Sequence, residues 1–265
     1  MKLGMPTLIE YRNIQDNIQL CKELELEFVE LNMNLPIFLP ETLPAQDILK
    51  LKKHHGIDFT IHLPEELDLS SFHQPIRKGH IERCKETIKW AQAAEIKTVN
   101  MHINNGIYFT LPHTRVWINE QYEERFLALL LDSCSELYEL CEQTSVQLCI
   151  ENTSNFHIPF IRRALEKLSD IYDHFCITWD VGHDAIGGYG DQAFILAHSE
   201  KVRHMHIHDY NGKSDHQPLF SGQVPLGDRL QFAKDRNLSV VVEVKTSSAL
   251  KDSISKLPFY TREII

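Results

Sequence analysis

The sequence lacks any hydrophobic run long enough to cross a membrane. Its most apolar helical stretch, residues 126–131, is far too short to span a bilayer and is bracketed by the charged residues 123–125 and Asp132. The chain enters its first β-like run without a basic segment, an apolar segment or a small-residue cleavage site before it. We therefore expect neither a membrane anchor nor secretion.

Cysteines are few, and their spacing forms no pattern. There is no C-x-x-C motif and no regular framework among the six, which are Cys21, Cys84, Cys134, Cys141, Cys149 and Cys176. We interpret these side chains as reduced and mostly buried. Because reduced cysteines are typical of the cytoplasm, the sequence predicts a cytoplasmic protein.

Positive charge is also scarce, since 27 Lys and Arg stand against 37 Asp and Glu and give a net charge of −10. This balance disfavours non-specific binding to nucleic acid or to an anionic membrane, and it favours a small-molecule partner. Glycine and proline, at 11 residues each, form no stretch typical of linkers or fibres. The length of 265 residues and the hydrophobic content of 43% fit one large domain over residues 1–265.

Short β-like runs alternate with amphipathic helical runs along the chain. The helical period is visible where apolar residues recur at Ile14, Ile18, Cys21 and Leu24. The eight β-like runs are residues 3–5, 28–34, 58–63, 98–103, 146–151, 177–181, 202–208 and 239–245. Such alternation predicts parallel strands covered by helices, in either an open doubly wound sheet or a closed barrel.

The two faces of each β-like run differ in polarity. In residues 28–34, for example, Val29 and Leu31 share one face, whereas Glu30 and Asn32 share the other. An open sheet with helices on both faces should read as nearly continuous apolar strands. The polar face therefore favours an α/β fold of the (β/α)8 TIM barrel type, with the apolar face against the helices and the polar face inward.

The polar faces carry metal-ligating residue types near the C-terminal strand ends, where barrel enzymes place their active sites. These residues are His62, His102, Glu151, Asp180, His206 and Glu243, and His216 follows in the next long loop. Imidazoles and carboxylates together suit zinc, manganese, cobalt or iron better than calcium, which prefers oxygen alone. His204 and His208 share the face of His206, so a ligand one step along that run is an alternative.

The order of these residues resembles that of the xylose isomerase-like TIM barrel superfamily, which contains sugar isomerases and epimerases and the endonuclease IV apurinic-site nucleases. The motifs that carry the resemblance are Ile61-His62-Leu63-Pro64, Asn100-Met101-His102, Ile150-Glu151-Asn152, Trp179-Asp180-Val181-Gly182-His183, Met205-His206-Ile207-His208-Asp209 and Val242-Glu243-Val244. The resemblance implies one to three divalent ions per chain, drawn from zinc, manganese, cobalt or magnesium.

The resemblance also implies roles for single residues. The residues that would hold a central metal are Glu151, Asp180, His206 and Glu243, and in the isomerase branch the two glutamates also move protons. The histidines that match further metals of the nuclease branch are His62 and His102 for a second ion and His183 and His216 for a third. Ser214 stands where an aspartate of the third site would fall, with Asp215 displaced by one residue. The candidate substrate-binding residues are Asn152, His183, Asp209 and Lys245.

Three further features of the sequence remain to be interpreted, and two of them have more than one interpretation. Lys245 shares the face of Glu243 and suits either a substrate oxygen or a rim salt bridge. Residues 104–117 form the longest insertion on the rim and suit a substrate lid, an oligomer contact or a packed loop. The histidines away from the strand ends are interpreted as surface residues, and they include His54, His55, His73, His113, His157, His174 and His198.

Three functions are compatible with this pattern. The first is a divalent-metal-dependent isomerase or epimerase of a sugar or a sugar-like compound, in which two glutamates transfer protons. The second is an endonuclease IV-like multi-zinc AP endonuclease or phosphodiesterase, against which the acidic charge and the absence of basic residues at 35–40 both argue. The third is a catalytically silent barrel. We expect a carbohydrate-like small-molecule partner before nucleic acid, no membrane partner, and a homo-oligomer as one possible assembly.

Overall fold

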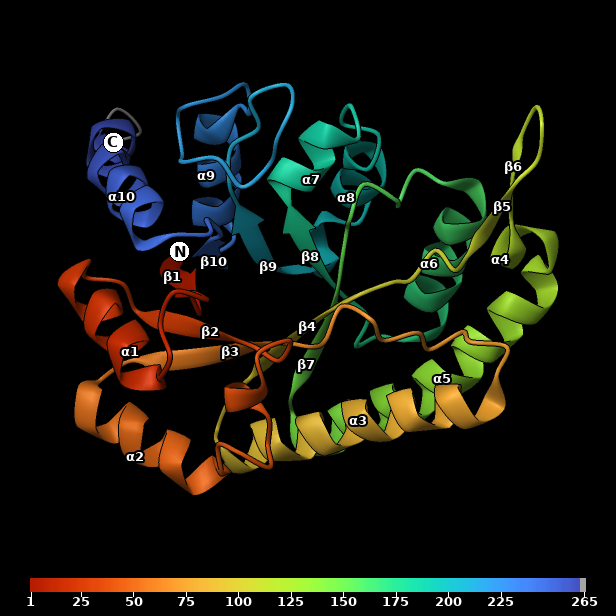
Figure 1. Cartoon of the computed structure of the whole chain (residues 1–265), viewed down its shortest axis with the longest axis horizontal. Coiled ribbons are helices and arrows are strands. Elements are labelled where there is room, and N and C mark those ends of the chain that lie inside the picture. The colour runs from red at the N-terminus through yellow and green to blue at the C-terminus, as the bar shows by residue number, and fades with distance from the viewer. Residues whose placement is uncertain (263–265) are drawn as a thin grey trace.

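The computed structural model describes residues 1–262, so residues 263–265, the last of the predicted domain, lie outside the described residues. Its centre is a closed barrel of eight parallel strands (Figure 1). The strands are β1 (Lys2–Pro6), β2 (Phe28–Asn32), β3 (Asp58–His62), β4 (Thr98–His102), β7 (Gln147–Glu151), β8 (Cys176–Asp180), β9 (Val202–Ile207) and β10 (Ser239–Val242). Pairing of β1 with both β2 and β10 closes the ring, and the predicted (β/α)8 fold is confirmed.

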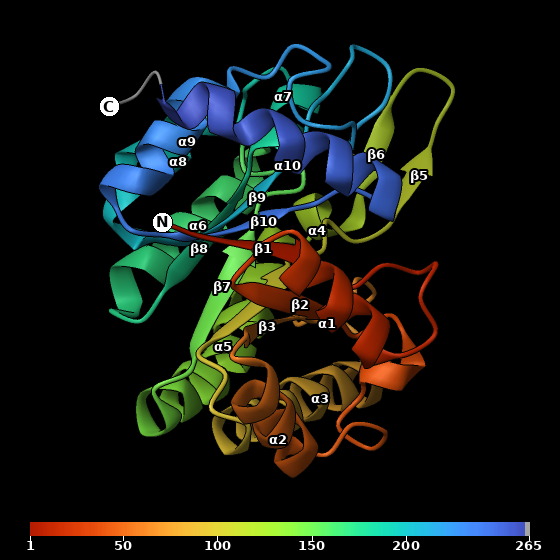
Figure 2. The same cartoon turned by 90° about the vertical axis from the view of Figure 1, so that its left-hand side faces the viewer.

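Helices surround the barrel, with α2 and α3 on one side and α9 and α10 on another (Figure 2). The helices are α1 (Ile14–Glu23), α2 (Ala45–His55), α3 (Gln74–Ala93), α4 (Ile118–Gln121), α5 (Glu123–Thr144), α6 (Pro159–Ile171), α7 (Val181–Ile186), α8 (Gln192–Ala197), α9 (Leu226–Asp235) and α10 (Ser247–Arg262), with 3-10 turns η1 (Pro36–Phe38) and η2 (Ser199–Lys201). Among residues 1–262, no helix combines the length and the hydrophobicity that a membrane crossing requires.

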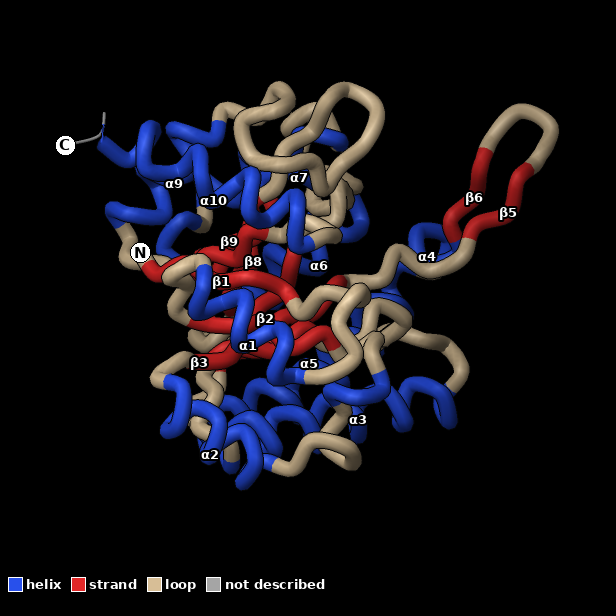
Figure 3. The backbone as a smooth tube through the Cα atoms, turned by 60° about the vertical axis from the view of Figure 1, so that its left-hand side comes forward, coloured by secondary structure: helices blue, strands red, loops and turns tan. Residues whose placement is uncertain are grey.

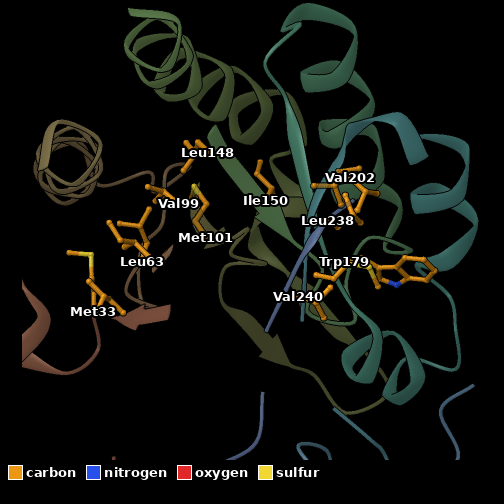
Figure 4. Packing of buried hydrophobic residues seen from close by; sticks show 14 of the residues in the cluster. Met33, Leu63, Val99, Met101, Leu148, Ile150, Trp179, Val202, Leu238 and Val240 are labelled. Atoms are coloured by element: carbon orange, nitrogen blue, oxygen red, sulfur yellow. The ribbon is translucent and has the colours of Figure 1, made fainter. Parts of the chain in front are cut away.

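The apolar faces of the strands pack outward against these helices, as their alternation predicted. Val99, Met101 and Leu148 of β4 and β7 lie in this layer (Figure 4), and all three are buried. All six cysteines, each of which lies within the described residues, are buried and free of disulfide bonds. The polar faces point into the barrel, so the core that stabilises the fold is a shell around a polar interior.

The rim insertion is more ordered than a loop. Residues 108–117 form an antiparallel hairpin of β5 (Tyr108–Thr110) and β6 (Arg115–Trp117), which projects from the barrel (Figure 3). The Arg115 guanidinium lies 4.9 Å from the centre of the Tyr108 ring, and Trp117 packs edge-on against the same ring. These contacts join the two strands, although Ile107 and Phe109 remain exposed.

Several strands are shorter than predicted at their C-terminal ends. The run predicted over 239–245 ends as a strand at Val242, and the run over 28–34 ends at Asn32. One further backbone hydrogen bond follows each end, from Met33 to the carbonyl oxygen of His62 and from Glu243 to that of Ile207, before the chain turns into the loops of the barrel mouth. Glu243 and Lys245 therefore belong to a loop and lie above the strand.

Leu165→Ala should lower the free energy of unfolding by about 2–5 kcal/mol, because Leu165 of α6 is fully buried and its loss leaves a cavity in the outer core. Leu196→Ala on α8 is the matched control, since Leu196 is 44% exposed and should cost less than about 1 kcal/mol. Urea denaturation followed by circular dichroism measures both. Equal losses in the two variants would contradict this packing.

Candidate metal centre

A pocket of about 540 Å³ opens at the C-terminal mouth of the barrel. The residues of its floor include His62, His102, Glu151, His183, His216 and Glu243. A larger pocket of about 830 Å³ opens at the opposite end, where the strands begin. None of the histidine–carboxylate clusters formed by residues 1–262 has a member that lines this second pocket. The candidate site is therefore the pocket at the mouth.

The central cluster contains the four residues predicted to hold one metal. A ligand atom of each lies within 4.8 Å of those of the others, and the residues are Glu151, Asp180, His206 and Glu243. Nδ1 of His206 lies 3.3 Å from a carboxylate oxygen of Glu151 and 3.3 Å from one of Glu243. Three different strands and the loop after β10 therefore deliver four donors to one point.

A second cluster shares Glu151 with the first. Nε2 of His62 and Nε2 of His102 lie 3.4 and 3.6 Å from the same oxygen, Oε2 of Glu151. Nδ1 of His62 is 2.7 Å from the carbonyl oxygen of Leu63, so this nitrogen carries a proton, and Nε2 is the nitrogen that would bind an ion after losing its own proton. Glu151 therefore belongs to both candidate metal clusters.

The third cluster joins His183 and His216 with His208, which was predicted only as an alternative to His206. Nδ1 of His208 accepts the backbone N–H of His216 at 2.9 Å, so its proton lies on Nε2, 3.1 Å from Oδ2 of Asp180. Both ring nitrogens of His208 therefore have hydrogen-bond partners. Although the residue lies close to the other two histidines, neither of its nitrogens is free to bind an ion. Asp215, which follows the exposed Ser214, lies beside the other two histidines, 3.3 Å from His216 and 3.7 Å from His183.

Several buried polar atoms of the site have no hydrogen-bond partner within the described part of the chain. Those that face the pocket are His102 Nε2, His183 Nδ1, His206 Nδ1, His216 Nδ1 and Glu243 Oε2. A buried donor or acceptor left unpaired costs about 1–3 kcal/mol, so a group of them at one place indicates a missing partner. Because the set mixes nitrogen and oxygen donors, the residues fit a divalent transition metal.

Electrostatics at the site favour charged side chains in spite of burial. Burial acts against ionisation of Glu151, but the neighbouring His206 and His102 hold the pKa of its carboxyl well below the usual range. Burial likewise opposes the charged imidazoles, yet the carboxylates around them prevail. They raise the pKa of His62 to about 9 and that of His183 to about 10. The pKa of His206 also rises well above its usual value.

Two predicted substrate-binding residues have their polar atoms occupied by backbone. Asn152 donates to the carbonyl oxygen of Asp180 at 2.9 Å and accepts the Asp180 N–H at 2.8 Å, which fixes that residue. Asp209 accepts the backbone N–H groups of Tyr210, Gly222 and Val224. This geometry favours a role in shaping the mouth, and substrate contact by either side chain stays a prediction.

Lys245 is exposed and lines the pocket of the mouth. No salt bridge of Lys245 is found among the side chains of residues 1–257, so its ammonium group is a candidate for binding a substrate oxygen. The histidines interpreted as surface residues lie outside all four clusters. Of these, His55 and His198 are half-buried, and His157 pairs with Asp191 at 2.8 Å.

Two supporting residues were given no role in the sequence analysis. Asn100 of β4 donates a hydrogen bond to Oε2 of Glu151, and Glu30 of β2 lies 3.0 Å from Nε2 of His206. Both stand on the polar strand faces, and that position is the one signal in the sequence that could have found them.

A steric constraint explains why glycine stands in the Asp-x-Gly-His motif. A Cβ atom on Gly182 would lie 2.0 Å from the His208 ring, well inside van der Waals contact. Only glycine lets the first turn of α7 approach this histidine, whose ring also stacks on His216 at 4.1 Å. Gly182 therefore permits the packing that orients His208 toward Asp180.

Comparison with known proteins places this chain among similar barrels. A relative, an uncharacterized protein of Methanocaldococcus jannaschii, is 25% identical over 256 residues, with 94% of each chain covered. The fold is also similar to a solved structure of a D-tagatose 3-epimerase-like protein, with a TM-score of 0.77, 21% identity, and 100% of this chain and 98% of that one covered.

Two further solved structures share the fold. A D-psicose 3-epimerase with D-tagatose, from Clostridium cellulolyticum H10, has a TM-score of 0.72 and 16% identity, with 99% of both chains covered. The IOLI protein with a zinc atom has a TM-score of 0.73 and 17% identity, with 100% of this chain and 98% of that one covered. A family model described as the xylose isomerase-like TIM barrel matches residues 18–260. The chain therefore belongs to the xylose isomerase-like TIM barrel family.

Proposed function

We propose that this chain is a divalent-metal-dependent epimerase or isomerase of sugars or sugar-like polyol and keto compounds. The observation that carries the proposal is the placement of two carboxylates around one point. Oxygens of Glu151 and Glu243 each lie 3.3 Å from Nδ1 of His206, although they come from separate walls of the barrel. Proton transfer at a carbon next to a carbonyl needs two such groups, one to remove a proton and one to return it.

The two glutamates perform the proton transfers. A divalent ion held by Glu151, Asp180, His206 and Glu243 would supply Lewis-acid polarisation of the substrate carbonyl. One glutamate removes the proton from the carbon beside that carbonyl, and the other, after taking up a proton from water, delivers it to the opposite face or to the neighbouring carbon. The pKa values of both glutamates lie well below the usual range, because neighbouring histidines outweigh burial, so each is ionised and able to accept a proton.

The pocket and the solved structures support a carbohydrate-like substrate. A volume of about 540 Å³ falls within the usual range of small-molecule sites. The structures of similar fold include a D-tagatose 3-epimerase-like protein, a D-psicose 3-epimerase with D-tagatose and a protein with a zinc atom. Lys245 is our candidate for binding a substrate oxygen at the rim. The cytoplasmic location and the homo-oligomer stay predictions.

A second candidate is an endonuclease IV-like phosphodiesterase. The cluster of His62, His102 and Glu151 favours it, because a proton-transfer reaction needs one central ion, whereas phosphodiester hydrolysis uses clustered ions to activate water and stabilise the leaving oxygen. The third cluster gives this hypothesis weaker support, because both ring nitrogens of His208 already have hydrogen-bond partners. Metal stoichiometry and activity on an abasic-site duplex distinguish the two candidates.

Glu151→Gln and Glu243→Gln should each reduce epimerisation of D-tagatose, D-psicose or D-fructose by about 10²–10⁴-fold, because each removes one proton-transferring group. In D2O, the product of the unaltered chain should carry deuterium at the reacting carbon, measured by NMR. Glu66→Gln, at an exposed rim residue outside the clusters, is the control and should keep full turnover. Undiminished turnover in Glu151→Gln would refute the proton-transfer role.

His102→Ala should remove a second ion and leave the central ion bound, because His102 belongs only to the cluster with His62 and Glu151. Elemental analysis before and after the change measures the loss, and His113→Ala on the exposed hairpin is the control. Epimerisation should persist in His102→Ala. If the variant instead loses cleavage of an abasic-site duplex that the unaltered chain performs, the phosphodiesterase is the correct function.

Metal binding at pH 7 should release protons. The pKa values of His62 and His183, about 9 and about 10, lie above this pH, so both imidazoles are protonated until an ion takes the nitrogen. As the pH rises through these values the release should fall towards zero. Titration calorimetry with zinc in buffers of different ionisation enthalpy measures it. A binding enthalpy that is independent of the buffer at pH 7 would contradict these protonation states.

A further inference from the structure

A buried carboxylate lies directly beneath the central cluster. Glu30 of β2 is 2% exposed and reaches across the barrel interior to His204 and His206 of β9. Two other strands, β1 and β10, separate β2 from β9 around the ring, so the contact crosses the barrel. None of the motifs that define the metal centre contains this glutamate.

Both oxygens of Glu30 are held by specific partners. Oε2 accepts the hydroxyl of Thr60 at 3.0 Å and lies 3.1 Å from Nε2 of His204, while Oε1 lies 3.0 Å from Nε2 of His206. Burial opposes the charge, yet His206 and His204 keep the pKa of Glu30 well below its usual range. The side chain is thus an ionised group that can only accept hydrogen bonds.

His204 fixes the orientation of this carboxylate. Its Nε2 must carry a proton because it faces an acceptor, so the hydroxyl of Ser239 donates to Nδ1 at 2.6 Å. Thr60 and His204 together occupy Oε2 from two sides of the barrel. Oε1 therefore stays turned toward His206, without freedom to rotate to another partner.

His206 differs from His204 in its hydrogen bonding. It is fully buried, and neither of its ring nitrogens has a hydrogen-bond partner of normal angle among the described residues. Its Nε2 lies at ion-pairing distance from Glu30, and its Nδ1 faces Glu151 and Glu243. Only the tautomer with a proton on Nε2 places a donor toward Glu30 and a lone pair toward the cluster.

We propose that Glu30 is a positioning residue, which holds the Nε2–H of His206 and so aims Nδ1 at the metal centre. The inference rests on the proposed metal-dependent function. A carboxylate behind a metal-bound imidazole fixes the tautomer and makes the coordinating nitrogen a stronger donor. Loss of such a partner typically lowers metal affinity by about 10–100-fold.

The test measures zinc affinity by competition with a chromophoric chelator, in the His102→Ala background so that the second cluster does not contribute. Glu30→Gln should weaken zinc binding by about 10–100-fold while the circular dichroism spectrum stays that of the parent. Glu27→Gln is the matched control, because Glu27 is an exposed glutamate just before β2 that touches no cluster. It should leave the affinity unchanged.

A spectroscopic measurement separates positioning from a merely structural role. With Co²⁺ in place of zinc, Glu30→Gln should shift the visible ligand-field bands, because the donor strength and direction of the imidazole change. Unchanged bands together with an affinity within twofold of the parent would overturn the role of Glu30 and leave the proposed function standing. Absence of metal binding by the unaltered chain would overturn both, so the two failures are distinguishable.

A measurement on the unaltered protein covers the case in which Glu30→Gln does not fold. In the zinc-loaded chain labelled with ¹⁵N-histidine, His206 should appear as the tautomer protonated on Nε2, with the signal assigned by its loss in His206→Gln. The opposite tautomer, protonated on Nδ1, would overturn the inference. This result does not depend on turnover of any substrate.

Discussion

The pairing of buried carboxylates with imidazoles is the constraint on which the rest of this structure depends. Glu151 is 1% exposed, and its two oxygens face His62, His102 and His206. An isolated carboxylate at this depth would be too costly to ionise, so the charge persists only because the barrel supplies partners on several sides. Ordinary TIM barrels fill this volume with branched apolar side chains. Here the apolar core is confined to the layer between strands and helices.

The closed parallel sheet explains why residues far apart in sequence meet. All eight strands end at the same mouth, and alternate side chains point inward, so one residue at the end of each strand is enough to build a cluster. The loops at the mouth are held by separate hydrogen bonds. Asn152 fixes the backbone of Asp180, and Asp209 binds three backbone N–H groups of its loop. The motifs thus combine residues that face the pocket with residues that hold its walls.

The period-2 alternation of the sequence was sufficient to predict the eight strands and the inward polar face, because both depend on local geometry. The same pattern could not place Glu30 beneath His206, since their contact depends on the closure of the ring and on the relative depth of β2 and β9. Nor could it separate His206 from His208, which share a face. The hairpin at 108–117 escaped detection because its strands have three residues each and bury little.

The same pairs that make the interior stable without an ion also prepare it to receive one. With no metal bound, protonated imidazoles of His62 and His183 offset the charge of the neighbouring carboxylates. A divalent ion held by the same residues would replace these protons with its own charge. Pre-organisation of this kind demands that each ligand keep its orientation before the metal arrives. The contacts beneath the cluster, from Glu30 to His206 and from His208 to Asp180, meet that demand from outside the ligand set.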